Sequence, residues 1–135
     1  MKIRILILLF CVMMFSCNEQ STDCTLKSYT VTATAYNSLA YQTNSNPSIT
    51  AFGDSLKPGL RYIAVSRDLL DSGLVHDTKV KIEGFDSLFT VKDKMNRRWR
   101  KRIDIYMGRD VKKAKKWGKK KVTIEYCIPV NDSLR

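Results

Sequence analysis

Two aspartates carry the strongest chemical signal in this sequence. Asp93 lies eleven residues before Asp104, and Asp104 lies inside the alternating segment Arg102-Ile103-Asp104-Ile105-Tyr106. Alternation of apolar and polar residues is typical of a half-buried β-strand. Two carboxylates on neighbouring strands can form an acid–base site if burial or mutual repulsion keeps one of them protonated near neutral pH. Asp93 and Asp104 are therefore the candidate catalytic residues.

Each aspartate also has a purely structural interpretation. Asp104 can accept hydrogen bonds from a loop or pair with Arg102, and Asp93 can be a turn residue at the end of a strand. A nearby positive charge lowers the pKa of a carboxyl and so opposes its use as an acid. Four basic residues surround the pair: Lys92, Lys94, Arg102 and Arg109.

The N-terminus predicts export. An apolar run of 11 residues follows Lys2 and Arg4, which is too short for a helix to cross a bilayer and fits a signal peptide. The ending Ser16-Cys17 favours a lipoprotein signal over residues 1–16, with Cys17 as the lipidated N-terminus and 17–26 as a tether. A plain secretory signal and an uncleaved anchor are the alternatives. We expect a membrane-anchored lipoprotein of the cell envelope, on the periplasmic or outer-membrane side.

The cysteines separate by position. Cys11 and Cys17 belong to the signal region, which leaves Cys24 and Cys127 for the mature domain. A pair of cysteines in an oxidising compartment predicts a disulfide, here between the two ends of the domain, although two unrelated thiols would fit as well. With His76 as the only histidine and no Cys/His cluster, neither a metal site nor a cofactor is expected.

The charge favours an anionic partner. The chain carries a formal net charge of +11, and residues 92–121 hold 15 Lys and Arg against three Asp. Such a field suits an acidic polysaccharide, an anionic membrane surface or nucleic acid, while a merely solubilising basic surface is the plainer alternative. Export disfavours nucleic acid, and Trp99, Tyr106 and Trp117 form no recognisable stacking motif.

The element pattern predicts one mainly β domain over residues 27–130, large enough to fold alone as a monomer. The long loop at 37–59 is of a kind that is often functional. A short helix is expected at 68–70 and another at 110–116, capped by Asp110, with Val111 and Ala114 on its inner side. Six strands are expected at 27–36, 62–65, 78–83, 88–92, 103–106 and 121–127, which fits a small closed barrel.

Six segments, taken in order, resemble one family. They are Thr32-Ala33-Thr34-Ala35-Tyr36, Ile63-Ala64-Val65, residues 78–85, Val91-Lys92-Asp93, residues 102–106, and Ala114-x-x-Trp117-Gly118 with Lys121-Val122. The order is similar to the three-aspartate (3D) domain, which is shared with lytic transglycosylase A and with stationary-phase survival and resuscitation-factor-like cell-wall proteins. The resemblance covers residues 28–128 and implies a six-stranded double-psi β-barrel with one or two short helices.

Two departures from the family pattern bear on activity. The family's first aspartate is replaced by Ser66-Arg67, with Asp68 two positions on, and a Gly-Gly pair is replaced by Lys94-Met95-Asn96. Only Asp93 and Asp104 match the remaining two aspartates directly. Asp68 would substitute for the first only through a shift in register.

The resemblance implies an exported peptidoglycan lytic transglycosylase, a lyase that cleaves the muramic acid–glucosamine bond to 1,6-anhydro products. One of the two aspartates would be the acid/base, and the other would tune or orient it. Contacts to sugar are expected from Thr34, Tyr36 and Thr50, with Trp99 as a stacking platform.

The alternative is a non-catalytic lipoprotein that binds cell wall or an anionic polysaccharide with the same barrel. In both cases the expected partners are glycan strands of peptidoglycan and a membrane reached through the N-terminal lipid. Trp117 is assigned to the core rather than to the sugar site.

Overall fold

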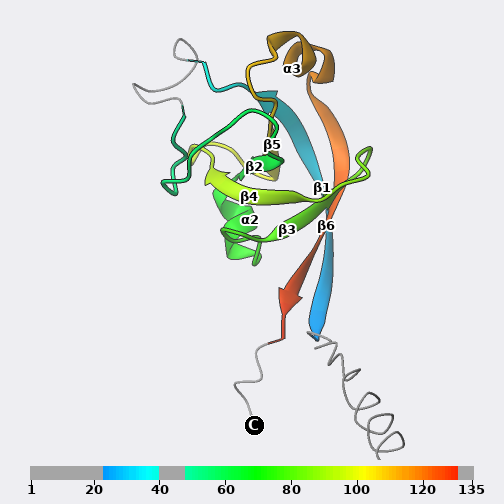
Figure 1. Cartoon of the computed structure of the whole chain (residues 1–135). Helices are drawn as coiled ribbons and strands as arrows, with labels where there is room; N and C mark the ends of the chain where they lie inside the picture. Colours follow the sequence, from blue (N-terminus) through cyan, green and yellow to red (C-terminus); the bar gives the residue numbers. More distant parts are fainter. Residues whose placement is uncertain (1–22, 40–47, 131–135) are drawn as a thin grey trace, which may run out of the picture.

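Six strands close into a barrel in the computed structural model, which describes residues 23–39 and 48–130 (Figure 1). The predicted signal over residues 1–16, the lipidation site Cys17 and most of the predicted tether lie outside the described residues. Two short helices, α2 (Arg67–Asp71) and α3 (Val111–Trp117), complete the fold. The strands are β1 (Cys24–Tyr36), β2 (Tyr62–Val65), β3 (Lys79–Ile82), β4 (Phe89–Lys94), β5 (Arg102–Tyr106) and β6 (Lys120–Pro129).

The strand order around the barrel is β1-β5-β2-β4-β3-β6. Two neighbouring pairs are parallel, β1 with β5 and β2 with β4, and the other pairs are antiparallel. Parallel neighbours need long crossover connections, so the order cannot be a simple meander. The predicted mainly β, six-stranded double-psi barrel with short helices is confirmed.

The core fills the barrel with alternate residues of every strand. Ile63, Val65, Ile103 and Ile105 are fully buried, whereas the residues between them face outward. This period of two is what the sequence predicts for strands with one face on a core. The rest of the barrel core consists of Val31, Ala33, Val80, Ile82, Phe89, Val91, Val122, Ile124 and Tyr126.

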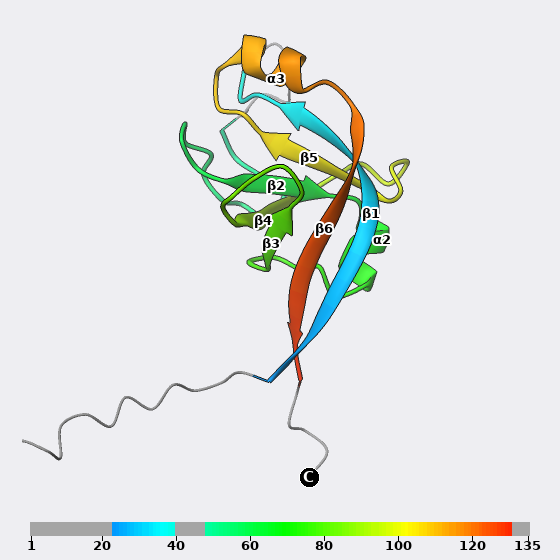
Figure 2. The same ribbon diagram turned by 90° about the vertical axis from the view of Figure 1, so that its right-hand side faces the viewer.

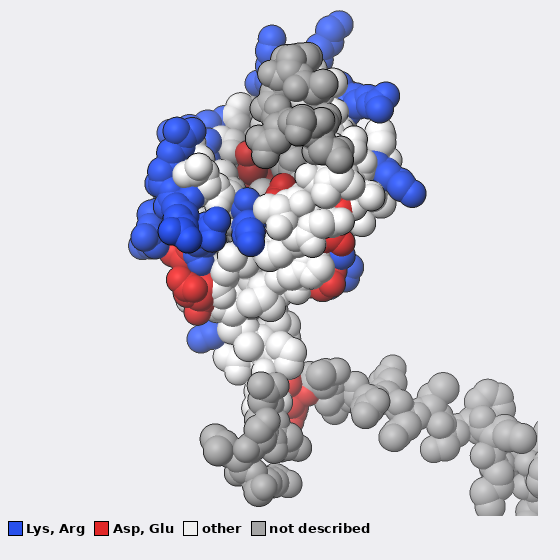
Figure 3. Space-filling view, turned by 90° about the vertical axis from the view of Figure 1, so that its left-hand side faces the viewer, with Lys and Arg blue, Asp and Glu red and all other residues white. Residues whose placement is uncertain are grey.

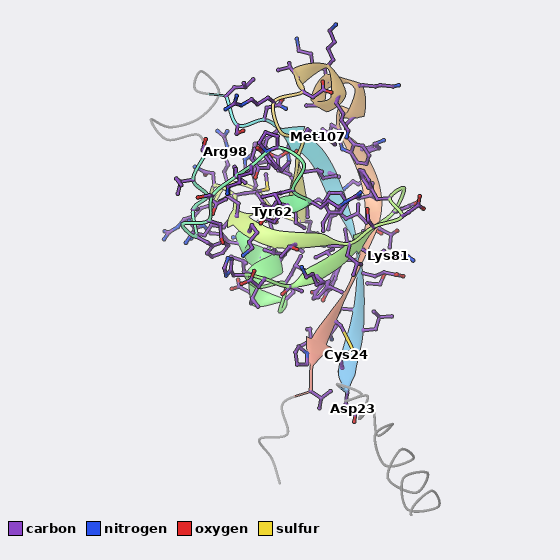
Figure 4. The ribbon with its side chains drawn as sticks, viewed as in Figure 1. Asp23, Cys24, Tyr62, Lys81, Arg98 and Met107 are labelled. Atoms are coloured by element: carbon purple, nitrogen blue, oxygen red, sulfur yellow. A yellow bond between two sulfur atoms is a disulfide. The ribbon has the colours of Figure 1, made fainter. Side chains whose placement is uncertain are left out.

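The first half of β1 and the second half of β6 form a two-stranded ribbon that continues past the barrel (Figure 2). A disulfide joins Cys24 to Cys127 near the end of this ribbon, with 5.6 Å between the Cα atoms (Figure 4). Strand β1 therefore starts inside the segment predicted as a tether. Tyr29, expected on the buried face with Val31, is 37% exposed in the ribbon, where its ring stacks on the edge of the core at Tyr126, with 6.2 Å between the centroids.

Helix α3 differs from its prediction in one respect. Its cap is as expected, since the Asp110 carboxylate accepts a hydrogen bond from the Lys113 N–H at 2.9 Å. However, α3 contains no buried residue. The predicted inner residues Val111 and Ala114 instead line an open cleft, so this helix covers the site rather than the core. Trp117 packs partly buried against the core, as expected. Among the described residues, no helix is long and apolar enough to cross a membrane.

Gly73 lies between α2 and β3 and packs against Ile128 of the ribbon. Its φ is +91°, and an added Cβ would lie 2.6 Å from Cδ1 of Ile128. We expect Gly73→Ala to lower the free energy of unfolding by about 2 kcal/mol, through backbone strain and overpacking. Urea denaturation measures the loss. Gly84→Ala is the matched control, since its φ is +86° and nothing lies within 4 Å. Equal losses in the two variants would show that the Ile128 contact costs nothing.

Candidate functional site

The two aspartates lie in one row across four neighbouring strands. Thr34 of β1 is in register with Asp104 of β5, Asp104 with Ala64 of β2, and Ala64 with Asp93 of β4. Residues directly opposite one another in a sheet project to the same face. Because the neighbours of Asp104 on its strand are core residues, this row faces outward. Ala64 has the smallest side chain of the four and leaves open space between the carboxylates.

A β-bulge turns Asp93 toward this face. Ile63 is paired with Val91, but Ala64 is paired with Asp93, so Lys92 is an extra residue in β4. In a regular strand Asp93, two positions after Val91, would point into the core as the fully buried Val91 does. Bulges redirect side chains in this way and recur next to active sites. With β2 between them, the Cα atoms of Asp93 and Asp104 are about 10 Å apart, or two strand spacings.

Asp104 is the more buried and more perturbed of the two. Burial raises its pKa from 3.8 to about 6, against a hydrogen bond from Thr34 and the charge of Arg102, and the negative charge of Asp93 adds to the rise. The Thr34 hydroxyl donates to Asp104 Oδ1 at 2.9 Å, and Arg102 Nε donates to Thr34 Oγ1 at 3.4 Å. No direct ion pair between Arg102 and Asp104 occurs in the structure.

Asp93 is better provided with donors. Its Oδ1 accepts hydrogen bonds from the backbone N–H groups of Ala51 and Lys94, both at 2.8 Å. Burial nevertheless raises the pKa of Asp93, although these two bonds and the charge of Lys94 oppose the rise. Two carboxyls with such different environments divide into an acid and an anion. Asp104 is thus the better candidate for the acid, and Asp93 for the carboxylate.

Tyr36 of β1 lines the same cleft as the two carboxyls and has an unused hydroxyl. This oxygen is buried and makes no hydrogen bond to any residue that the structure describes. Burial, together with the charges of Asp93 and Asp104, raises the pKa of Tyr36, so the hydroxyl stays protonated. Its ring packs against Tyr106 with 5.4 Å between the centroids. Tyr36 therefore keeps a hydrogen-bond donor that no described residue uses, while its predicted contact to sugar stays a prediction.

Two clefts meet at Tyr36 and Asp104, which line both. The β4-side cleft, of about 250 Å³, is further lined by Ala64, Asp93, Lys94, Met95, Asn96 and Trp99. The α3-side cleft, of about 590 Å³, extends in the other direction, and its further lining includes Thr34, Asn37, Arg102, Ala114, Lys115 and Lys119. A chain-like ligand lying in both clefts would pass over Asp104.

The other two predicted sugar contacts have different surroundings. Trp99 lines the β4-side cleft, with the guanidinium carbons of Arg102 and Arg98 at 3.9 and 4.9 Å from its ring centroid. Thr50 is buried, and its hydroxyl accepts a hydrogen bond from the Asp54 N–H at 3.0 Å. Thr50 therefore shapes the loop that places the Ala51 N–H on Asp93, and it lines neither cleft.

Asp68 does not join the pair. Its Oδ2 accepts a hydrogen bond from the Lys101 N–H at 2.9 Å. Burial works to raise the pKa of Asp68, but this bond, the Ser66 hydroxyl and the charge of Arg100 outweigh it and lower the pKa. At the position of the family's first aspartate, the Ser66 hydroxyl accepts a hydrogen bond from Arg102 N–H at 3.0 Å. Both residues thus hold the start of β5.

Several contributors to the site were missed at the level of sequence. Lys115 and Lys119 line the α3-side cleft, and Ala64 separates the carboxyls. Arg102 was expected beside the aspartates as a charge that lowers the pKa of a carboxyl, and it does so for Asp104. The only signal for Lys115 was its spacing, one and four residues after Ala114 and Val111, on a helix that was expected to face the core. A second polar group surrounds the bulge, where Lys92 contacts Asp54 at 3.0 Å and Asp77 at 2.5 Å.

Basic side chains are unevenly distributed over the face of the molecule drawn in Figure 3. In Figure 3, Lys and Arg gather along one edge and at the top, with acidic atoms visible between them. Arg98 and Lys81 lie on opposite sides of the barrel in Figure 4. Within residues 23–39 and 48–130, no three His, Cys, Asp or Glu side chains are grouped closely enough to hold a metal ion.

The pKa of Asp104 leads to a titration that is open to measurement. Because the pKa is raised above 3.8 in the folded state, this group stabilises the fold fully below about pH 4 and loses that contribution as the pH rises through about 6. We expect the ¹³C signal of the Asp104 carboxyl to titrate near pH 6, and Asp93→Asn to lower its midpoint. An unchanged midpoint in Asp93→Asn would show that the carboxyls are not coupled.

Comparisons with known proteins found similarity to solved structures, and it is low. No family model and no curated protein matches this sequence. The chain is similar to the crystal structure of apo Clavibacter michiganensis expansin, with 19% identity and a TM-score of 0.44, over 78% of this chain and 52% of that one. A mutant of the same expansin in complex with cellohexaose has 17% identity and the same score and coverage. The chain therefore spans about half the length of these expansins.

Proposed function

We propose that this chain is an exported peptidoglycan lytic transglycosylase built on a 3D-type barrel. The observation that carries the proposal is Asp104, a half-buried carboxyl with a pKa of about 6 at the junction of two open clefts. Such a group is protonated in a useful fraction of molecules at neutral pH and can lose its proton during turnover. Asp93 and Tyr36 complete the site from either side.

The geometry supports a reaction with one acid/base. Protonated Asp104 donates its proton to the glycosidic oxygen as the bond to the anomeric carbon breaks. The 6-hydroxyl of the same sugar attacks that carbon, and its proton passes to the Asp104 carboxylate, which restores the acid. Asp93, held as an anion by two N–H groups, stabilises positive charge at the anomeric carbon. The Tyr36 hydroxyl donates to a sugar oxygen. No water enters, in contrast to glycoside hydrolysis.

The test is mass spectrometry of the soluble products released by the purified protein from isolated peptidoglycan. Anhydro-muropeptides that disappear with Asp104→Asn would support the transglycosylase. Products with reducing ends would contradict it and indicate a hydrolase.

A second function is favoured by the departures from the family pattern. Ser66 stands in place of the first aspartate, so the site has one carboxylate fewer. Lys94-Met95-Asn96 stands in place of the glycine pair, so larger side chains line the β4-side cleft. A non-catalytic lipoprotein that binds cell wall would keep the clefts without turnover. Sedimentation with the wall pellet, in the absence of any soluble product, would support this alternative.

The proposal includes attachment to a membrane through Cys17. It is supported by the apolar run and the Ser16-Cys17 ending of the sequence. If it is correct, Cys17→Ser moves the protein from the membrane fraction to the soluble fraction of the envelope. Retention of the variant in the membrane would favour an uncleaved anchor.

A further inference from the structure

The α3-side cleft is strongly cationic. Three basic side chains line it, Arg102, Lys115 and Lys119, against the single carboxyl of Asp104. None of the three is within ion-pair distance of an acidic side chain in the part of the chain that the structure describes. Positive charge that has no internal partner and faces a cleft is suited to an anionic group of a ligand.

Arg102 is held in place without using its charge. Its guanidinium lies 3.9 Å from the Trp99 ring centroid, and its Nε donates to Thr34 Oγ1 at 3.4 Å. These contacts orient the guanidinium plane and occupy the Nε position, while the two terminal nitrogens make no hydrogen bond to a described residue. A guanidinium held in this way can bind a carboxylate through two parallel hydrogen bonds.

The spacing of α3 brings a second cation to the same cleft. Val111, Ala114, Lys115 and Gly118 recur at helical intervals and all line the cleft, whereas Lys112 and Lys116 do not. Residues three and four apart lie on one face of a helix. One face of α3 is therefore a wall of the cleft, and Lys115 projects from that wall. Lys112 and Lys116 lie on the same helix but do not line the cleft, so a lysine substitution there is a matched control for Lys115.

We infer that the α3-side cleft is a subsite for a sugar that carries a carboxylate, with Arg102 as its main ligand and Lys115 as a second. The inference rests on the proposed function and gives the glycan a direction. The muramyl sugar, with its lactyl carboxylate, lies in the α3-side cleft, and the uncharged N-acetylglucosamine lies in the β4-side cleft near Trp99. The site thereby selects against neutral glycans of the same backbone.

Two ligands that differ only in the lactyl groups test this selection. One is the tetrasaccharide of alternating N-acetylglucosamine and N-acetylmuramic acid without stem peptides, and the other is chitotetraose, the tetramer of N-acetylglucosamine. Binding is measured by calorimetry on the Asp104→Asn variant of the full chain, so that no ligand is cleaved. We expect the acidic tetrasaccharide to bind about 10-fold to 100-fold more tightly, as a charge-assisted bidentate contact predicts. Equal affinity for the two ligands would overturn the inference.

Substitutions then locate the carboxylate. Arg102→Gln is expected to bring the affinity ratio of the two ligands close to one, and Arg102→Lys to retain part of that ratio. Lys115→Gln should lower the ratio, whereas Lys112→Gln, with the same change of charge on the same helix, should not. Equal effects of these two lysine variants would mean a diffuse basic field and would overturn the subsite. If neither ligand binds at all, the proposed function fails together with the inference.

Discussion

Asp104→Asn is expected to reduce glycan cleavage by about 10²-fold to 10⁴-fold, the usual contribution of a positioned acid/base. The amide keeps the shape of the carboxyl but has no proton to transfer. The release of anhydro-muropeptides, followed by mass spectrometry over time, measures the loss. Asp86→Asn is the matched control, because it makes the same change at an exposed turn outside both clefts.

The same variant should be more stable than the parent at high pH. Ionised Asp104 opposes folding once the pH exceeds its raised pKa of about 6, and an amide removes this cost. The difference between 3.8 and about 6 corresponds to a gain of about 3 kcal/mol at pH 8, which shrinks toward zero below about pH 4. Urea denaturation at both pH values measures it. Loss of cleavage together with loss of stability would instead point to a structural role for Asp104.

Removal of the disulfide should have the largest effect on stability. Cys24 and Cys127 are separated by 103 residues, so the bond closes almost the entire described domain into one loop. In the chain-entropy model, a loop of this size stabilises the folded state by up to about 4 to 5 kcal/mol. We expect the double variant Cys24→Ser, Cys127→Ser to lose stability of this order in urea denaturation.

The location of the bond predicts a second, opposite result. The disulfide lies near the end of the β1–β6 ribbon, past the barrel (Figure 4). Where the double variant is folded, its binding of peptidoglycan should match that of the parent. Reduction of the parent protein should reproduce the loss of stability. A variant as stable as the parent would show that the ribbon's own pairing already holds the two ends together.

Much of the fold follows from local patterns. Strand β2 was predicted with its observed bounds, and the paired apolar positions Val80 and Ile82 are buried as expected. Both helices were anticipated, including the cap at Asp110. These features depend on side-chain periodicity and on turn and cap residues, which act within a few positions of the chain. The prediction that Tyr29 is buried was wrong, because its exposure depends on where the barrel ends.

The site is a different matter, because it depends on register between strands. The sequence alone nominated Asp93, Asp104, Thr34 and Tyr36. It could not show that Ala64 separates the two carboxyls, since that follows from pairings between segments about 30 to 40 residues apart. Nor did it reveal the bulge at Lys92, without which Asp93 would point into the core.

The sequence by itself therefore determined the element types, the core positions and the identity of the two aspartates, because these are written in local periodicity and residue type. Only the tertiary structure decided which aspartate is the better acid, because a pKa depends on burial and on neighbours brought in from other strands. It also showed that α3, which was expected to pack on the core, forms one wall of a cleft lined by basic side chains. That outcome depends on how the barrel closes, which no local pattern specifies.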